Sequence, residues 1–264
     1  MITRLLTLLL SAALGLAAAG AARVQDPAIT MGDAINIAGR QRMLSQRIAQ
    51  SYLLMGLQPQ SGRGAKVLNR SINEFDRNHA ALQQFAPGAA VRGELDAVEQ
   101  LWLPYKTLAL GEVSKESAAL LIERSDTLLA AAHAYVGKLQ VLSGTTKAEL
   151  INVAGRQRML SQRIAKNFLA SHWGINVDTS KSALAADLAE YGTMLDYLYE
   201  SPVNTEQIRS RLDRVKGQLR YAVKGFDGVM SLSSKRLVQV VTGTTDAMLR
   251  GMNEVTGLYA QLLK

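Results

Sequence analysis

The sequence predicts an all-α protein made of two tandem antiparallel four-helix bundle units that are related by internal duplication. Three observations predict this fold. The 264 residues are rich in Ala, Leu, Gln, Glu, Lys and Arg, which favour helix, and they include only five prolines. No run alternates apolar and polar residues as a half-buried β-strand would. One fifteen-residue segment occurs twice.

The repeated segment reads INIAGRQRMLSQRIA at 35–49 and INVAGRQRMLSQRIA at 151–165, so 14 of its 15 positions are identical. Fainter echoes continue along both halves. Glu74-Phe75 matches Glu190-Tyr191, and Asp126 matches Asp246. We therefore expect residues 23–143 and 144–264 to be two copies of one unit that form a pseudo-dimer. The alternative is that the halves pair with a second chain.

Prolines, glycines and capping residues divide each half into four helices. Pro59 and Pro87-Gly88 interrupt the first half, and Ser114 is a candidate N-cap. Residues 143–146 are either a loop or a soft spot in one long helix that joins the halves. Pro104 predicts a kink or an early end of the third helix. The expected helices are 33–57, 64–85, 89–110 and 115–142, then 147–173, 180–200, 204–230 and 234–263.

The first 22 residues predict a signal peptide. Arg4 gives a positive start, the next residues are apolar, and Ala19-Gly20-Ala21 is a small-residue cleavage pattern. The apolar run is short for a membrane span, which takes about 20 residues. We expect a periplasmic protein that contacts the membrane only if the segment stays uncleaved, with residues 5–22 as an inner-membrane anchor. Cysteine is absent, which excludes disulfides and a lipoprotein attachment site.

The formal net charge of +8 is concentrated in two short clusters. Neither repeated segment contains an acidic residue. A nucleic-acid-binding protein would spread Lys and Arg over an extended face with aromatic residues between them, so we expect no nucleic-acid partner. Two compact clusters favour a small anion or an acidic protein as partner. The clusters are Arg40, Arg42 and Arg47, and Arg156, Arg158 and Arg163.

The repeated segment predicts a helix with two apolar faces. One face suits the interior of its own bundle, and it carries Ile37, Leu44, Ile48 and Met55. The opposite stripe has the spacing of a helix–helix seam, with glycine and alanine to allow close approach. The stripe consists of Ile35, Ala38, Gly39, Arg42, Gln46, Ala49 and Leu53, and recurs as Ile151, Ala154, Gly155, Arg158, Gln162, Ala165 and Leu169.

Arg42 and Arg158 are the candidate binding residues because each interrupts this apolar stripe. An unpaired charge that is buried costs on the order of several kcal/mol. If the two arginines face each other, an anion between them relieves both charges, and planar oxyanions match the donor fork of a guanidinium. The alternative is that each arginine reaches solvent or an acid from another helix. The remaining ligand-binding candidates are Gly39, Gly155, Gln46 and Gln162.

The other arginines have different expected roles. Arg40 and Arg156 point away from the stripe, so we expect solvent around them. Arg47 and Arg163 lie on its flank, where a carboxylate from a neighbouring helix is the expected partner.

At these residues the chain resembles a known family. The repeated segment resembles the opening helix of the type IV pilus methyl-accepting chemotaxis transducer N-terminal (PilJ-type) domain. It is also similar to the P-box, N-x-A-G-x-x-R-M-x-S-x-R, of NarX-like nitrate/nitrite sensor kinases. The resemblance implies a four-helix bundle that dimerises and binds nitrate through Arg42 and Arg158 at the interface. It adds four secondary motif positions, which are Asn36, Asn152, Arg47 and Arg163.

Together these observations predict an exported, free-standing sensor-type protein that binds nitrate or nitrite and passes a signal to an envelope receptor or transducer. The alternative is an envelope or pilus-associated interaction module without a small-molecule ligand. We expect no enzyme, metal or cofactor. The only histidines, His79, His133 and His172, are far apart, and no acids cluster as metal ligands would. Ser45 and Ser161 have no histidine nearby in sequence to activate them.

Overall fold

The computed structural model describes residues 29–85, 88–228 and 234–263. The predicted signal peptide, residues 1–22, lies outside this part of the chain. The described residues form helices joined by short turns, without a strand. None of these helices is long and apolar enough to cross a membrane.

Each half supplies four long helices, as predicted, and their ends lie within three residues of the expected ones. The early end expected at Pro104 is wrong, because the third helix continues past it. The first half also contains a short 3-10 helix, η1 (Pro59–Ser61). The long helices are α1 (Met31–Leu57), α2 (Arg63–Phe85), α3 (Ala89–Ala109), α4 (Lys115–Ser143), α5 (Thr146–Trp173), α6 (Val177–Tyr199), α7 (Glu206–Gly228) and α8 (Ser234–Gln261).

The two halves are joined by a sharp turn. Gly144 ends α4 in the left-handed conformation, with φ 62°, which glycine adopts without steric cost. Thr145 then caps α5, because its side chain accepts a hydrogen bond from the backbone N–H of Ala148 at 3.1 Å. Thr30 caps α1 in the same way, through the backbone N–H of Asp33. Residues 143–146 are therefore a turn. Helices α1 and α5, which contain the two repeated segments, each begin after a capping threonine.

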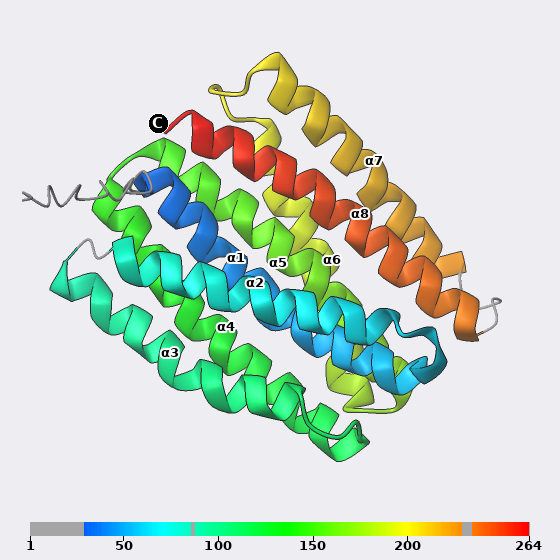
Figure 1. Ribbon diagram of the computed structural model, residues 1–264. Coiled ribbons are helices and arrows are strands. Elements are labelled where there is room, and N and C mark those ends of the chain that lie inside the picture. Colours follow the sequence, from blue (N-terminus) through cyan, green and yellow to red (C-terminus); the bar gives the residue numbers. More distant parts are fainter. Residues whose placement is uncertain (1–28, 86–87, 229–233, 264) are drawn as a thin grey trace, which may run out of the picture.

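The two arginine helices, α1 and α5, pack along each other at the centre of the molecule (Figure 1). Helices α2 and α4 pack on α1, and α6 and α8 pack on α5. Helix α3 packs on α4 and α7 on α8, so α3 and α7 lie at opposite sides (Figure 1). The halves thus form two four-helix bundles that pair within one chain, which confirms the pseudo-dimeric fold predicted from the duplication.

The central pairing buries both faces of each arginine helix. On the own-bundle face, Leu44 and Ile48 are fully buried. On the seam, Ala38, Ala49 and their counterparts Ala154 and Ala165 are also fully buried. A helix that is enclosed on both sides needs two apolar stripes, and this explains the unusual pattern of the repeated segment.

Candidate functional site

The site begins where the backbones of α1 and α5 lie close together at two glycines. A Cβ atom added to Gly39 would lie 3.8 Å from the Cα atom of Gly155, and the reverse distance is also 3.8 Å. The same added Cβ would lie 3.0 Å from Nη2 of Arg158 and 3.5 Å from Nη2 of Arg42. The glycines therefore make room for the guanidinium groups of both repeats, as their predicted place in the site requires.

Arg42 reaches across the seam into the second repeat. Its Nη2 donates a hydrogen bond to the backbone carbonyl oxygen of Asn152 at 3.0 Å. Its Nη1 lies 3.1 Å from Nδ1 of His133 on α4. A guanidinium has only donors, so His133 accepts this hydrogen bond at an unprotonated Nδ1. Asn152 is itself fixed, because its side chain donates to Gln140 on α4.

Arg158 makes the mirror-image contacts into the first repeat. Its Nη2 donates to the backbone carbonyl oxygen of Asn36 at 3.0 Å, and its Nη1 donates to the side-chain oxygen of the same residue at 2.8 Å. Asn253 on α8 stands where the first repeat has His133, and its side-chain oxygen lies 3.4 Å from Nη1 of Arg158. The pairing of α1 with α5 thus creates a site with approximate two-fold symmetry.

Both guanidinium groups are fully buried, and among the described residues no carboxylate forms an ion pair with either. Burial, together with the charge of Arg156, lowers the pKa of Arg42 to about 9. Burial, followed by the charges of Arg40 and Arg42, lowers the pKa of Arg158 well below its usual value. The direction is that of cations which lack both water and a counter-ion. The site is therefore a concentrated, uncompensated positive charge inside the protein.

The hydrogen-bonding capacity of the two arginines is only partly used. Each Nε is buried and has no hydrogen-bond partner in the described part of the chain. Each terminal nitrogen carries two hydrogens, and the contacts above use only some of them. Unsatisfied buried donors are uncommon in native proteins, and here they accompany the uncompensated charge.

Gln46 and Gln162, the other predicted ligand-binding side chains, lie in contacts between helices. Nε2 of Gln46 donates to the backbone oxygen of Ser125 on α4 at 3.0 Å, and Nε2 of Gln162 lies 3.5 Å from the backbone oxygen of Thr245 on α8. The side-chain oxygen of Gln162 accepts from Arg47 at 2.7 Å. No hydrogen bond joins either glutamine to the guanidinium group of Arg42 or Arg158 among the described residues.

Arg47 and Arg163 pair with carboxylates of neighbouring helices, as expected from their place on the flank. Arg47 binds Asp246 on α8 at 2.8 Å. Arg163 binds Asp187 on α6 through Nε at 2.8 Å. The two repeats therefore use the same motif position for different partners.

The expectation of solvated side chains at Arg40 and Arg156 is wrong. Arg40 forms an ion pair with Glu74 on α2 at 3.1 Å, and Arg156 forms the matching pair with Glu190 on α6. Both arginines are only partly exposed. The repeated glutamates were visible in the sequence, but only the packing of α2 on α1 and of α6 on α5 shows why they recur.

The backbone oxygens of Asn36 and Asn152 and the side chains of His133 and Asn253 are site groups that the sequence did not reveal. The motif named the two asparagines but gave no reason to expect their main chain to receive an arginine. His133 and Asn253 differ in type and lie far outside the repeated segment, so no pattern connected them.

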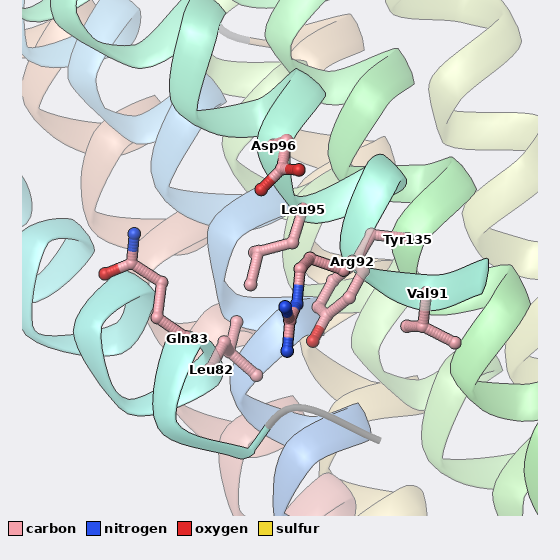
Figure 2. A pocket seen from close by; sticks show the side chains of 7 residues that line it. All are labelled: Leu82, Gln83, Val91, Arg92, Leu95, Asp96 and Tyr135. Atoms are coloured by element: carbon pink, nitrogen blue, oxygen red, sulfur yellow. The ribbon is translucent and has the colours of Figure 1, made fainter. Parts of the chain in front are cut away.

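A separate pocket lies away from this site. Figure 2 shows its lining, which comes from the end of α2, the start of α3 and Tyr135 of α4. Its volume is about 220 Å³. The hydroxyl of Tyr135 is buried there without a hydrogen-bond partner among the described residues, and burial raises its pKa to about 12. The pocket contains none of the predicted site residues.

The comparisons with known proteins agree with the repeat structure. The model of a family described as type IV pili methyl-accepting chemotaxis transducer N-term (PilJ) matches residues 30–135 and again residues 143–242. No curated protein and no solved structure was found to match the chain. The two matched regions cover most of the sequence, and each begins shortly before an arginine helix. The chain therefore belongs to the PilJ family of non-catalytic sensory domains from chemotaxis transducers, of which it contains two tandem copies.

Proposed function

We propose that this protein is an exported sensor that binds a small planar oxyanion, nitrate or nitrite, between Arg42 and Arg158. The observation that carries the proposal is the pair of fully buried guanidinium groups without a carboxylate partner in the described residues. The Nη2 atoms of both arginines lie close to one point. A Cβ atom added to Gly155 would be 3.0 Å from Nη2 of Arg42 and 3.2 Å from Nη2 of Arg158. An anion at this place would neutralise charge where burial makes it most costly.

The donor geometry supports a planar ligand. The two Nε–H groups have no hydrogen-bond partner in the part of the chain that the structure describes, and terminal N–H groups remain on both side chains. Forks of parallel N–H donors bind planar oxyanions through paired hydrogen bonds. The resemblance to NarX-like sensors, in which the same motif arginine binds nitrate, adds to this argument.

The seam also offers a route for a signal. Arg42 and Arg158 each connect α1 with α5, and through His133 and Asn253 they also contact α4 and α8. An anion that draws both guanidinium groups toward itself would change these contacts and so shift the packing of the two bundles. We propose that an envelope receptor or transducer reads this shift, in keeping with the sensory family of the chain.

The test is isothermal titration calorimetry of the chain lacking residues 1–22 with nitrate, nitrite, chloride and sulfate at fixed ionic strength. Nitrate or nitrite should bind, and binding should raise the melting temperature because only the folded state has the site. Arg42→Lys and Arg158→Lys keep the charge but lose the donor fork, so they should weaken binding by about tenfold or more. Arg40→Ala is the matched control, because Arg40 lies on the same helix but pairs with Glu74.

Two results would contradict the proposal. Equal weak heats for all four anions would indicate charge screening without a site. Unchanged nitrate binding by folded Arg42→Lys and Arg158→Lys would show that other residues bind the anion. Circular dichroism of each variant establishes that it is folded before the titration is interpreted.

A further inference from the structure

A second cavity lies beside the arginine helix of the second repeat, between α4, α5 and α6. Its volume is about 440 Å³, within the range of about 300–1,000 Å³ that is typical of small-molecule sites. Its charged lining consists of Asp126, Asp187, Lys166, Arg156 and Arg163, and three alanines provide an apolar wall. The alanines are Ala130, Ala183 and Ala186.

The duplication supplies an internal reference for this cavity. Gln46 reaches the backbone of Ser125 as Gln162 reaches that of Thr245, which aligns α4 with α8. The matching pairs of Arg40 with Glu74 and Arg156 with Glu190 align α2 with α6 in the same way. By this alignment, Asp126 corresponds to Asp246, and the cavity corresponds to a groove between α8, α1 and α2.

In the first repeat an arginine of the chain itself occupies that groove. Arg63, in the first turn of α2, donates from Nη2 to Oδ2 of Asp246 at 3.1 Å and from Nη1 to the hydroxyl of Thr242 at 3.3 Å. Asp246 also binds Arg47 at 2.8 Å, so this carboxylate has two cationic partners. The residue that corresponds to Arg63 in the second repeat is Thr179, which is exposed and uncharged.

Asp126 has one cationic partner, whereas its counterpart Asp246 has two. Its Oδ1 accepts from Nζ of Lys166 at 2.6 Å, and no other cation contacts it among the described residues. Its side chain is 52% exposed, whereas that of Asp246 is 16% exposed. The carboxylate of Asp126 is thus open to the cavity on the side where Arg63 closes the first groove.

The alanines keep this space open. Ala130, Ala183 and Ala186 stand where the first repeat has larger side chains. The corresponding residues are Arg250, Val67 and Arg70. The second repeat therefore lacks the arginine that binds the carboxylate in the first repeat, and it has smaller side chains at three positions that line the cavity.

Each cationic side chain that lines the cavity is paired with a carboxylate. Arg163 pairs with Asp187, Arg156 with Glu190, and Lys166 with Asp126. In the first groove Arg40 pairs with Glu74, while Asp246 pairs with both Arg47 and Arg63, so the ion pairs there include one cation more than carboxylates. A bound cation would give the second repeat the electrostatic arrangement that the first repeat already has.

We infer that this cavity binds a small organic cation of the size of arginine, whose guanidinium or primary ammonium group contacts Asp126 as Arg63 contacts Asp246. The ligand's methylene groups would lie along the three alanines. This site is separate from the proposed anion site, although His133 lines the cavity and also bonds Arg42. The two sites therefore have different ligands and independent tests.

The experiment is calorimetric titration of the chain lacking residues 1–22 with L-arginine, agmatine, L-lysine and L-citrulline. Citrulline keeps the α-ammonium and α-carboxylate of arginine but has a neutral ureido group in place of the guanidinium. If the side-chain cation is the group that contacts Asp126, citrulline should bind at least about tenfold more weakly than arginine, agmatine or lysine. Thr179→Arg introduces an arginine on α6 at the position that corresponds to Arg63 on α2. Its side chain should occupy the cavity and bind Asp126, and so abolish the binding of free arginine. Ala185→Arg is the matched control, because it adds the same charge at an exposed position of α6 outside the cavity lining.

Three results would overturn the inference. These are no heat with any of the cations at millimolar concentration, equal binding of arginine and citrulline, and unchanged arginine binding by Thr179→Arg. Asp126→Asn serves as a second variant that removes the carboxylate, and it should also abolish binding. Retained nitrate binding by Thr179→Arg would show that the loss concerns this cavity alone.

Discussion

Gly39 and Gly155 face each other at the crossing of the two arginine helices, with a distance of 3.8 Å from the Cα atom of each to the place where the other would carry a Cβ. Close approach of two backbones requires that neither residue has a side chain. The same crossing brings Nη2 of Arg158 to 3.0 Å from the Cβ position of Gly39. The glycines are therefore part of the packing and of the candidate site at once.

A methyl group at this crossing should destabilise the protein. Gly39→Ala must displace the Arg158 guanidinium or separate the helices, which we expect to lower the free energy of unfolding by about 1–3 kcal/mol. Gly93→Ala is the control, because nothing lies within 4 Å of its added Cβ, and it should stabilise the helix by about 0.5–1 kcal/mol. Urea unfolding measures both. The double variant Gly39→Ala/Gly155→Ala should be non-additive, since the two positions touch; strict additivity would mean that they act independently.

Acid should weaken the contact between Arg42 and His133. Burial, followed by the charges of Arg42 and Arg156, lowers the pKa of His133 below 6.5, although Glu190 opposes this shift. The unfolded chain therefore takes up this proton first, and stability present above pH 6.5 is lost as the pH falls through the window between the unfolded and folded pKa values. We expect the melting temperature to fall between pH 7.5 and pH 5.

The replacement His133→Asn isolates this effect. Asparagine is the residue that the second repeat has at the corresponding position, where Asn253 faces Arg158. It accepts a hydrogen bond and does not titrate, so the variant should lose less stability than the wild type over the same pH range. Identical pH profiles for the two proteins would contradict a role for His133. The remaining pH dependence would include His79, whose pKa burial also lowers.

The C-terminal ends of the two arginine helices also pack closely against each other. A Cβ added to Gly56 on α1 would lie 2.0 Å from Cη2 of Trp173 on α5. Gly56→Ala should therefore cost about 1–3 kcal/mol by overpacking, whereas Gly137→Ala, with nothing within 4 Å, should not. In a Trp173→Ala background the cost of Gly56→Ala should disappear in urea unfolding. A cost that persists there would point to a clash with another group.

The stability lost when the ion pair of Lys166 with Asp126 is broken should depend on which partner is replaced. Lys166 is 1% exposed, so Asp126→Asn leaves a buried ammonium without its counter-ion. We expect a loss of about 1–3 kcal/mol, less than for a fully buried pair because Asp126 is half-exposed. The first repeat has glutamine, Gln50, at the position that corresponds to Lys166. Lys166→Gln should therefore lower the free energy of unfolding by less than Asp126→Asn does. Thermal and urea unfolding compare the two, and a larger loss for Lys166→Gln would contradict this view.

The sequence by itself determined the helical fold, the duplication and the ends of the helices to within three residues. These features follow from local chemistry: Ser114 caps a helix, Gly144 permits a left-handed turn, and the repeated stripe needs two apolar surroundings. Arg42 and Arg158 could be singled out for the same reason, because a charge in an apolar stripe is conspicuous in any sequence.

Only the tertiary structure decided what surrounds those arginines. The backbone oxygens of Asn36 and Asn152, and the unlike pair His133 and Asn253, come to the site through the pairing of α1 with α5 and the packing of α4 and α8. A backbone carbonyl has no sequence signature, and two residues of different type in diverged helices share no pattern. The partners of a buried charge depend on which helices meet, and that is a property of the folded chain alone.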